Sequence, residues 1–209
     1  MTVISIAIGA ALLALGVNAF AQEPRRFAPL KPEEMSDAQR KVYEEIAGGP
    51  RGGVRGPFNA LLRNPELADR AQKLGEVMRF RSSLPPRLNE LAILITGRYW
   101  SAQYEWYAHR KLGAQAGLSE QLMTDIAEGR RPGAMSDDER VVYDFCTELH
   151  NDKSVSDAAF KAVVERFGER GAVDLVGVSG YYTLVSMVLN VEHHPLPEGV
   201  LSPLAPLKK

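Results

Sequence analysis

Apolar residues recur at helical spacing along most of this chain, and few stretches alternate between apolar and polar residues as half-buried strands do. Two motifs, Ser36–Gln39 and Ser136–Glu139, have the pattern of capping boxes at helix starts. Prolines 85–86 begin a further helix, and Ser156 heads one that runs to Phe167. The sequence therefore predicts an all-α protein.

Size and charge limit the classes of partner. With 209 residues, 45% of them hydrophobic, the chain is long enough for one globular domain with a sizeable core. The net charge is −1, and acidic residues closely follow the small basic groups at 25–26 and 130–131. We therefore expect no nucleic-acid partner.

The first residues have the pattern of a secretion signal. An apolar run from Val3 to Val17 precedes Ala19-Phe20-Ala21, which places small residues at the −3 and −1 positions of a cleavage site. We expect residues 1–21 to be removed, leaving a periplasmic or secreted protein without a membrane contact. Because Met1-Thr2 adds no basic side chain, an uncleaved anchor remains the alternative. Residues 22–35 contain three prolines and are expected to form an extended arm.

A second apolar stretch, residues 172–191, is long enough to span a bilayer and contains only Asp174 as a formal charge. Polar and small residues recur along it, however, which favours a buried core or subunit-interface helix. These residues are Gly177, Ser179, Gly180, Thr183, Ser186 and Asn190.

Two other features are interpreted as structural. Cys146 is the one cysteine, so no intramolecular disulfide can form, and its apolar neighbours indicate a buried thiol. The glycine-rich segment 48–53 lacks the GK[ST] ending of a phosphate-binding loop and is interpreted as a flexible connector.

The strongest chemical signal lies in residues 90–109. On a helix, Glu105 and His109 project from the same face and could exchange a proton. Such a pair is also common on protein surfaces, where it contributes only tenths of a kcal/mol. Glu90 lies among leucines and isoleucines, so its pKa could be raised for proton transfer, or it could pair structurally with Arg87 or Arg98.

Neighbouring aromatic and histidine residues complete the set of candidates. Tyr104 and Trp106 could line a pocket for an unsaturated or aromatic acid, although core packing is the alternative for each. His193 and His194 are adjacent and have only one nearby carboxylate, so we expect no metal site. His150 is interpreted as a cap at the C-terminal end of a helix.

Several motifs, in this order, resemble the carboxymuconolactone decarboxylase family, which also includes alkyl hydroperoxidase D. They are Gly56-Pro57-Phe58 with LLRNPEL, LNELAILITGR around Glu90, Gln103–Trp106 with His109, and GYYTLVSMVLNVEHHPLPEG. The resemblance covers most of residues 36–199, which we assign to one domain, with 200–209 as a C-terminal tail. It implies an alkyl hydroperoxidase D-like helical domain, an active site on two adjacent helices, and homo-oligomers that are trimers or hexamers.

One departure from the peroxidase branch of this family affects the expected chemistry. In that branch, a glutamate is followed twelve residues later by Cys-x-x-Cys and then by histidine. Counting from Glu90 places the cysteine positions at Ala102 and Glu105, with His109 in register. Since a thiolate nucleophile and a resolving thiol are both missing, peroxidase activity is not favoured.

The resemblance and the residues together predict a lyase or isomerase that uses acid–base chemistry, without cofactor or metal, on a small organic acid or lactone. His109 is expected to be the acid, Glu105 to orient it and Glu90 to join a proton relay, with Tyr104 and Trp106 contacting the substrate. Two alternatives remain open, an alkyl hydroperoxidase D-like peroxidase and a non-catalytic oligomeric binding protein.

Overall fold

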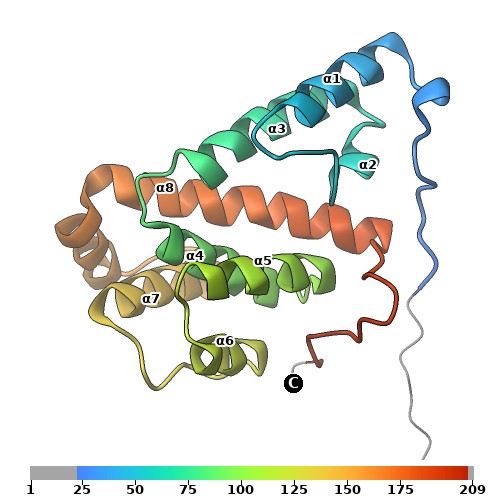
Figure 1. The fold of residues 1–209 in the computed structure, drawn as a ribbon. Coiled ribbons are helices and arrows are strands. Elements are labelled where there is room, and N and C mark those ends of the chain that lie inside the picture. Colours follow the sequence, from blue (N-terminus) through green and yellow to red (C-terminus); the bar gives the residue numbers. More distant parts are fainter. Residues whose placement is uncertain (1–22, 207–209) are drawn as a thin grey trace, which may run out of the picture.

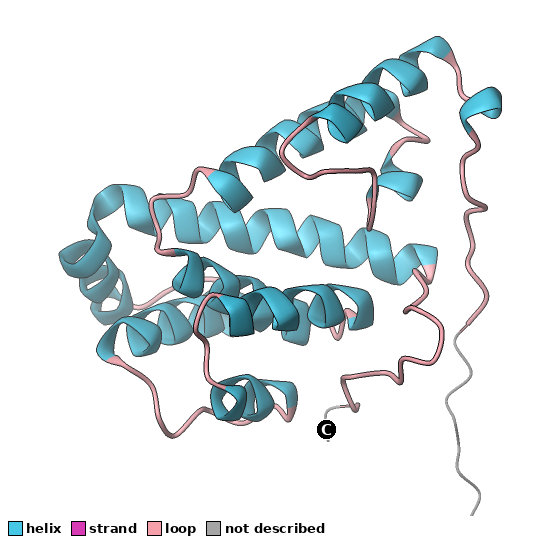
Figure 2. Cartoon of the chain, viewed as in Figure 1, coloured by secondary structure: helices cyan, strands magenta, loops and turns pink. Residues whose placement is uncertain are grey.

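The structure, a computed structural model, describes residues 23–206, and every regular element in that range is a helix (Figures 1 and 2). The predicted signal peptide lies outside the described residues. The elements are η1 (Pro32–Glu34), α1 (Asp37–Gly48), α2 (Phe58–Leu61), α3 (Pro65–Phe80), α4 (Pro86–Tyr99), α5 (Gln103–Gln115), α6 (Glu120–Ala127), α7 (Asp137–Asp152) and α8 (Asp157–Glu192).

Both predicted capping boxes are present. The Ser36 hydroxyl accepts a hydrogen bond from the backbone N–H of Gln39, and Ser136 accepts one from Glu139, each at 3.3 Å. The side chains of Gln39 and Glu139 accept the reciprocal bonds from the serine N–H groups. These contacts satisfy N–H groups that would otherwise be unpaired in the first turn, and so they fix where α1 and α7 begin.

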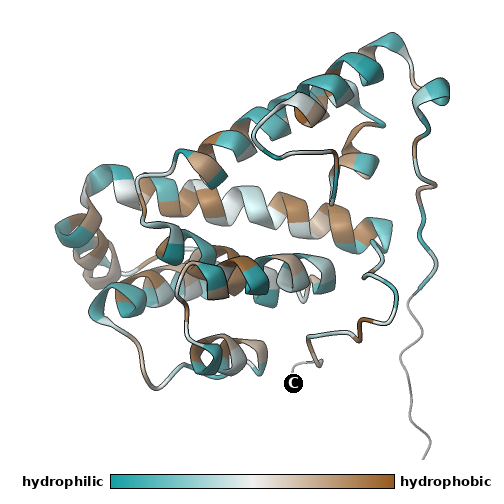
Figure 3. Ribbon diagram, viewed as in Figure 1, coloured by the Kyte–Doolittle hydropathy of each residue, from teal (hydrophilic) through white to brown (hydrophobic). Residues whose placement is uncertain are grey.

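The long helix α8 lies between two layers of shorter helices. It contacts α2 and α3 on one side and α4, α5 and α7 on the other (Figure 1). Apolar residues are frequent along α8, whereas polar residues dominate α1 and α3 (Figure 3). The central position of α8 allows both layers to bury apolar side chains against it.

The two helices predicted on either side of residue 168 are both present, and α8 comprises the two of them, joined by a kink at Gly168. The φ of Gly168 is +71°, in the left-handed region that favours glycine.

Within residues 23–206, α8 is the one helix long and apolar enough to cross a membrane, and 56% of its most apolar window is buried in the protein. Its Asp174 accepts hydrogen bonds from the backbone and hydroxyl of Ser83 at 2.7 and 2.6 Å. These contacts are those of a core helix.

The segments on either side of the predicted domain pack against it. In the arm, the Arg25 guanidinium donates to Glu192, at the end of α8, and Asn59 donates to the same carboxylate oxygen at 2.8 Å. In the tail, Leu204 is buried and its backbone exchanges two hydrogen bonds with the side chain of Gln103. The described parts of the arm and of the tail therefore belong to the folded unit.

Candidate active site

Two consecutive helices bring the three predicted catalytic residues together. The turn between α4 and α5 is short and includes Ser101 in a left-handed conformation, so the two helices pack closely. His109 Nδ1 lies 2.7 Å from a carboxylate oxygen of Glu90 on α4. Its Nε2 lies 2.9 Å from Oε1 of Glu105, one turn earlier on α5. The result is a Glu90–His109–Glu105 chain with one carboxylate at each ring nitrogen.

The charge state of His109 follows from these neighbours. Burial by itself lowers the pKa of the imidazole, but the charges and hydrogen bonds of Glu105 and Glu90 outweigh burial and raise the pKa to about 9. At neutral pH the ring is therefore an imidazolium, whose Nδ1–H donates to Glu90 and whose Nε2 forms an ion pair with Glu105. The alternative partners predicted for Glu90 are occupied elsewhere, because Arg87 pairs with Glu139 and Arg98 donates to the Ala205 carbonyl.

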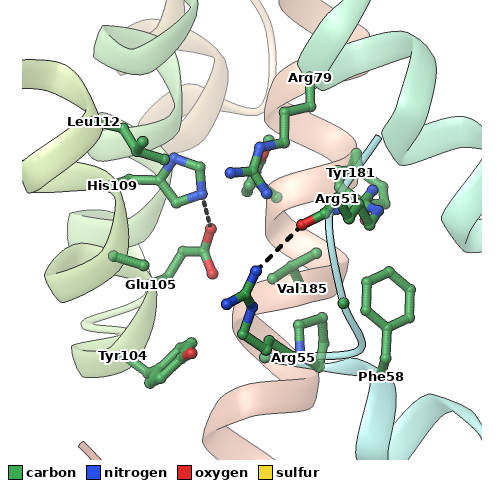
Figure 4. Close-up of a pocket in the computed structure, with 15 residues that line it drawn as sticks. Arg51, Arg55, Phe58, Arg79, Tyr104, Glu105, His109, Leu112, Tyr181 and Val185 are labelled. Atoms are coloured by element: carbon green, nitrogen blue, oxygen red, sulfur yellow. Dashed lines mark hydrogen bonds and ion pairs between the residues drawn. The ribbon is translucent and has the colours of Figure 1, made fainter. Parts of the chain in front are cut away.

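A cavity of about 200 Å³ opens beside Glu105 and His109 (Figure 4). Its size is below the roughly 300–1,000 Å³ of sites for drug-sized ligands, which points to a small ligand. Figure 4 shows Glu105 and His109 on one wall and three arginines on the side facing them, with Tyr181 and Val185 of α8 behind. The lining residues are Arg51, Gly53, Arg55, Gly56, Pro57, Phe58, Arg79, Tyr104, Glu105, Ala108, His109, Leu112, Tyr181, Tyr182 and Val185.

The two predicted substrate-binding aromatics have different positions. Tyr104 lines the cavity, as expected. The assignment of Trp106 is wrong, because its side chain is 0% exposed and packs in the hydrophobic core instead of lining the cavity. Two residues apart on a helix, these side chains point about 200° apart, so only one of them can face the cavity.

The three arginines of the cavity were not predicted from the sequence. Arg51 and Arg55 lie in the loop between α1 and α2, which overlaps the segment 48–53 interpreted as a connector, and Arg79 is near the end of α3. The repeated glycines were the one signal available. Gly52, Gly53 and Gly56 all have positive φ, and this backbone brings the two loop arginines to the cavity.

Tyr181 and Tyr182 of α8 also line the cavity, and neither was predicted from the sequence as a site residue. The ring of Tyr182 contacts His109 edge-on, with centroids 5.0 Å apart. Burial raises the pKa of Tyr182 well above its usual value, and the charge of Glu105 raises it further, so the phenol stays neutral. Arg51 Nη2 donates to the Tyr181 hydroxyl at 3.1 Å. Gly75 of α3 makes room for this contact, since a β-carbon there would collide with both Tyr181 and Arg51.

The thiol of Cys146 does not line the cavity beside Glu105 and His109. Cys146 is 0% exposed in the core, as predicted, and its Sγ accepts a weak hydrogen bond from Ser179. Burial raises its pKa to about 12, so the thiolate is scarce at neutral pH. Ala102, at one of the two cysteine positions of the peroxidase branch, is the fully buried N-cap of α5.

The remaining histidines make other contacts. His150 is not the C-terminal cap that we expected: its Nε2 lies 2.9 Å from the Thr96 hydroxyl and its ring stacks on Tyr99, while Lys153 occupies the cap position. His194 Nδ1 lies 3.0 Å from the buried Glu192 carboxylate. Within residues 23–206, no group of three or more histidine, cysteine or carboxylate side chains is arranged to hold a metal ion.

The helical arrangement is an alkyl hydroperoxidase D (AhpD)-like fold. No model of a known protein family matches the sequence, and no curated protein matches it. A protein of unknown function from Agrobacterium tumefaciens, provisionally assigned as the antioxidant defence protein AhpD, has a TM-score of 0.60 and 18% identity over 68% of this chain and 99% of its own. An uncharacterised peroxidase-related protein from Ralstonia eutropha JMP134 with an AhpD core has a TM-score of 0.68 and 17% identity over 88% of this chain and 99% of its own. At these identities the likeness concerns the fold.

Proposed function

We propose that the protein is an acid–base lyase or isomerase of the carboxymuconolactone decarboxylase type, acting on a small organic acid or lactone. The observation that carries this proposal is the Glu90–His109–Glu105 chain, which ends at the wall of a small cavity. A buried imidazolium between two carboxylates can store a proton and move it without a cofactor.

The geometry changes the roles that the sequence suggested. His109 has no free ring nitrogen, because one is directed at Glu90 and the other at Glu105. Glu105 lines the cavity and Glu90 does not. Glu105 is therefore the group that transfers a proton to or from the substrate, and His109 supplies that proton to Glu105.

In the proposed decarboxylation, the bond to the carboxylate carbon breaks, CO₂ leaves, and the electron pair remains on the substrate as a carbanion or enolate. His109 passes its Nε2 proton to Glu105, and Glu105 delivers a proton to that carbon. This transfer becomes favourable only as negative charge develops on the substrate. His109 keeps its Nδ1–H bond to Glu90 and regains a proton from water. In an isomerisation, Glu105 would remove a proton from one carbon and return it to another.

The alternative of a thiol peroxidase has less support. One of the solved structures with this fold is described as peroxidase-related, but the described cavity contains no cysteine, and Cys146 is buried elsewhere. Disulfide-forming peroxide reduction requires a second thiol, which this sequence does not have.

A substrate screen tests the proposal. Lactones and unsaturated or β-keto acids are incubated with the wild type, with Glu105→Gln and with the matched control Glu120→Gln, whose exposed carboxylate pairs with Arg110 outside the cavity. CO₂ release and ring isomerisation are measured. We expect turnover by the wild type and the control and a loss of about 10²–10⁴-fold in Glu105→Gln. If Glu105→Gln keeps the wild-type rate, the proposed site is wrong. Binding without turnover would instead support a binding protein.

A further inference from the structure

Three arginines approach the cavity from the side opposite the proton relay. Arg51 and Arg55 come from the loop before α2, and Arg79 comes from α3, so none of them lies on α5, the helix that carries Glu105 and His109 (Figure 4). In the described part of the chain, none of the three lies within ion-pair distance of a carboxylate. Their charges are therefore not neutralised by the protein.

The three guanidinium groups differ in how far they are already engaged. Arg51 donates to the Tyr181 hydroxyl and lies over the rings of Phe58 and Phe80, so it is held in place. Arg55 donates only to backbone carbonyls of its own loop, at 3.1 and 3.3 Å. Arg79 has one described partner, the ring of Phe80 at 5.1 Å. The N–H groups of Arg55 and Arg79 are therefore the more available to a ligand.

The charge balance of the cavity favours an anion. The relay of two carboxylates and one imidazolium carries a net charge of −1 at neutral pH, and the three arginines add three positive charges. Arg51 and Arg79 are half-buried and Arg55 is exposed, so an anion that enters from solvent can reach the guanidinium groups and is attracted by their summed charge. Guanidinium groups match carboxylates because their N–H groups form parallel, bidentate hydrogen bonds.

We infer that Arg55 and Arg79 bind the carboxylate of the ligand and position it against Glu105. Arg51, fixed by Tyr181, contributes charge. This inference rests on the proposed function for the identity of the site, but it concerns binding and does not require turnover. Because the glycine-rich loop supplies Arg55, the loop would contribute to substrate selection.

Calorimetry with simple anions tests the inference directly. Succinate, maleate and benzoate are titrated into the full chain, each alongside its methyl ester, in a chloride buffer. The variants are Arg79→Gln and Arg55→Gln, with Arg81→Gln as the matched control, because Arg81 lies two residues from Arg79 and pairs with Glu76 away from the cavity. Circular dichroism and thermal midpoints confirm that each variant is folded.

We expect the wild type to bind at least one of the acids more tightly than its ester. Arg79→Gln and Arg55→Gln should each weaken binding of that acid about 10- to 100-fold, the range for losing a charged hydrogen bond, while Arg81→Gln should not. Three results would each overturn the inference: no binding of any of the acids, equal binding of acid and ester, or wild-type affinity in both cavity variants.

The same variants separate this inference from the proposed function. Glu105→Gln should keep the anion binding but lose turnover. If the wild type binds the acid through Arg55 and Arg79 but turns over nothing, the inference stands and the proposed function fails. If a substrate is turned over and neither arginine variant raises its KM, the inference fails and the function stands. In an active enzyme, Arg79→Gln should raise the KM, and Arg79→Lys should give a KM between that of Arg79→Gln and that of the wild type.

Discussion

Two histidines of this molecule are about equally buried and are held in opposite charge states. His109 is 4% exposed and His150 is 8% exposed. His109 lies between two carboxylates that raise its pKa to about 9. Burial and the charge of Lys153 lower the pKa of His150 to about 4. Burial alone would lower both values, so the neighbours decide the difference.

Helix α4 contributes a neighbour to both histidines. Its Glu90 accepts from His109, and its Thr96, six residues later, contacts His150 with a neutral hydroxyl. A carboxylate stabilises the imidazolium, whereas a hydroxyl can accept from or donate to a neutral ring. A single helix thus supports one charged histidine beside the candidate active-site cavity and one neutral histidine outside that cavity.

The largest expected effect is on turnover, which should depend on His109 and not on His150. His109→Ala should remove most turnover of a substrate found in the screen, by about 10²–10⁴-fold, because Glu105 then loses its proton supply. His150→Gln should retain the wild-type kcat, since His150 does not line the cavity. Steady-state kinetics on folded variants measure both. Equal losses in the two variants would mean that the comparison reflects folding and not catalysis.

The next effect is on stability, and it has opposite signs at the two histidines. Because the pKa of His109 is raised in the folded state, its stabilisation is fully present below pH 6.5 and is lost as the pH rises through about 9. The difference corresponds to roughly 3 kcal/mol of unfolding free energy. Urea unfolding at pH values from 6 to 10 should show this decline, and Glu90→Gln should make it smaller. A flat profile would contradict the charged relay.

Because the pKa of His150 is lowered, its stabilisation is fully present above pH 6.5 and is lost as the pH falls toward 4. The expected loss is again roughly 3 kcal/mol at most. Urea unfolding of the wild type and His150→Gln between pH 7 and 4 measures it, and the variant should lose less. If both proteins decline equally, other groups account for the acid sensitivity.

A smaller effect is expected on the pKa of His150 when the charge of Lys153 is removed. Since its charge is the second cause of the lowered pKa of His150, after burial, Lys153→Met should raise that pKa without moving the pKa of His109. An NMR titration of the histidine ring signals reports both values. A shift in His109 as well would show that the two sites are coupled through α4.

The smallest expected effect concerns the thiol. Cys146→Ser should leave any native turnover unchanged, because Cys146 is buried in the core and does not line the cavity. The wild type should not reduce hydroperoxides with a dithiol reductant. Thiol-dependent turnover that disappears in this variant would restore the peroxidase alternative.

Local signals in the sequence predicted most of the helices and part of the site. The capping boxes and prolines marked helix starts, and the four-residue spacing placed Glu105 beside His109. The partner of Glu90 was left open because it depends on how α4 packs against α5. The three arginines were missed because they reach the cavity from segments that are separate from α4 and α5 in the sequence.

Gly75 has a consequence for how the chain can evolve. With no side chain at this position, Arg51 and Tyr181 occupy the space that a β-carbon would need. An alanine there would displace both side chains. Substitutions at positions 51, 75 and 181 should therefore occur together, although these residues lie on three different segments. Among relatives of this chain, we expect a side chain at position 75 to accompany changes at 51 and 181. Sequence covariation at these three positions would therefore indicate which relatives keep a cavity of the same shape.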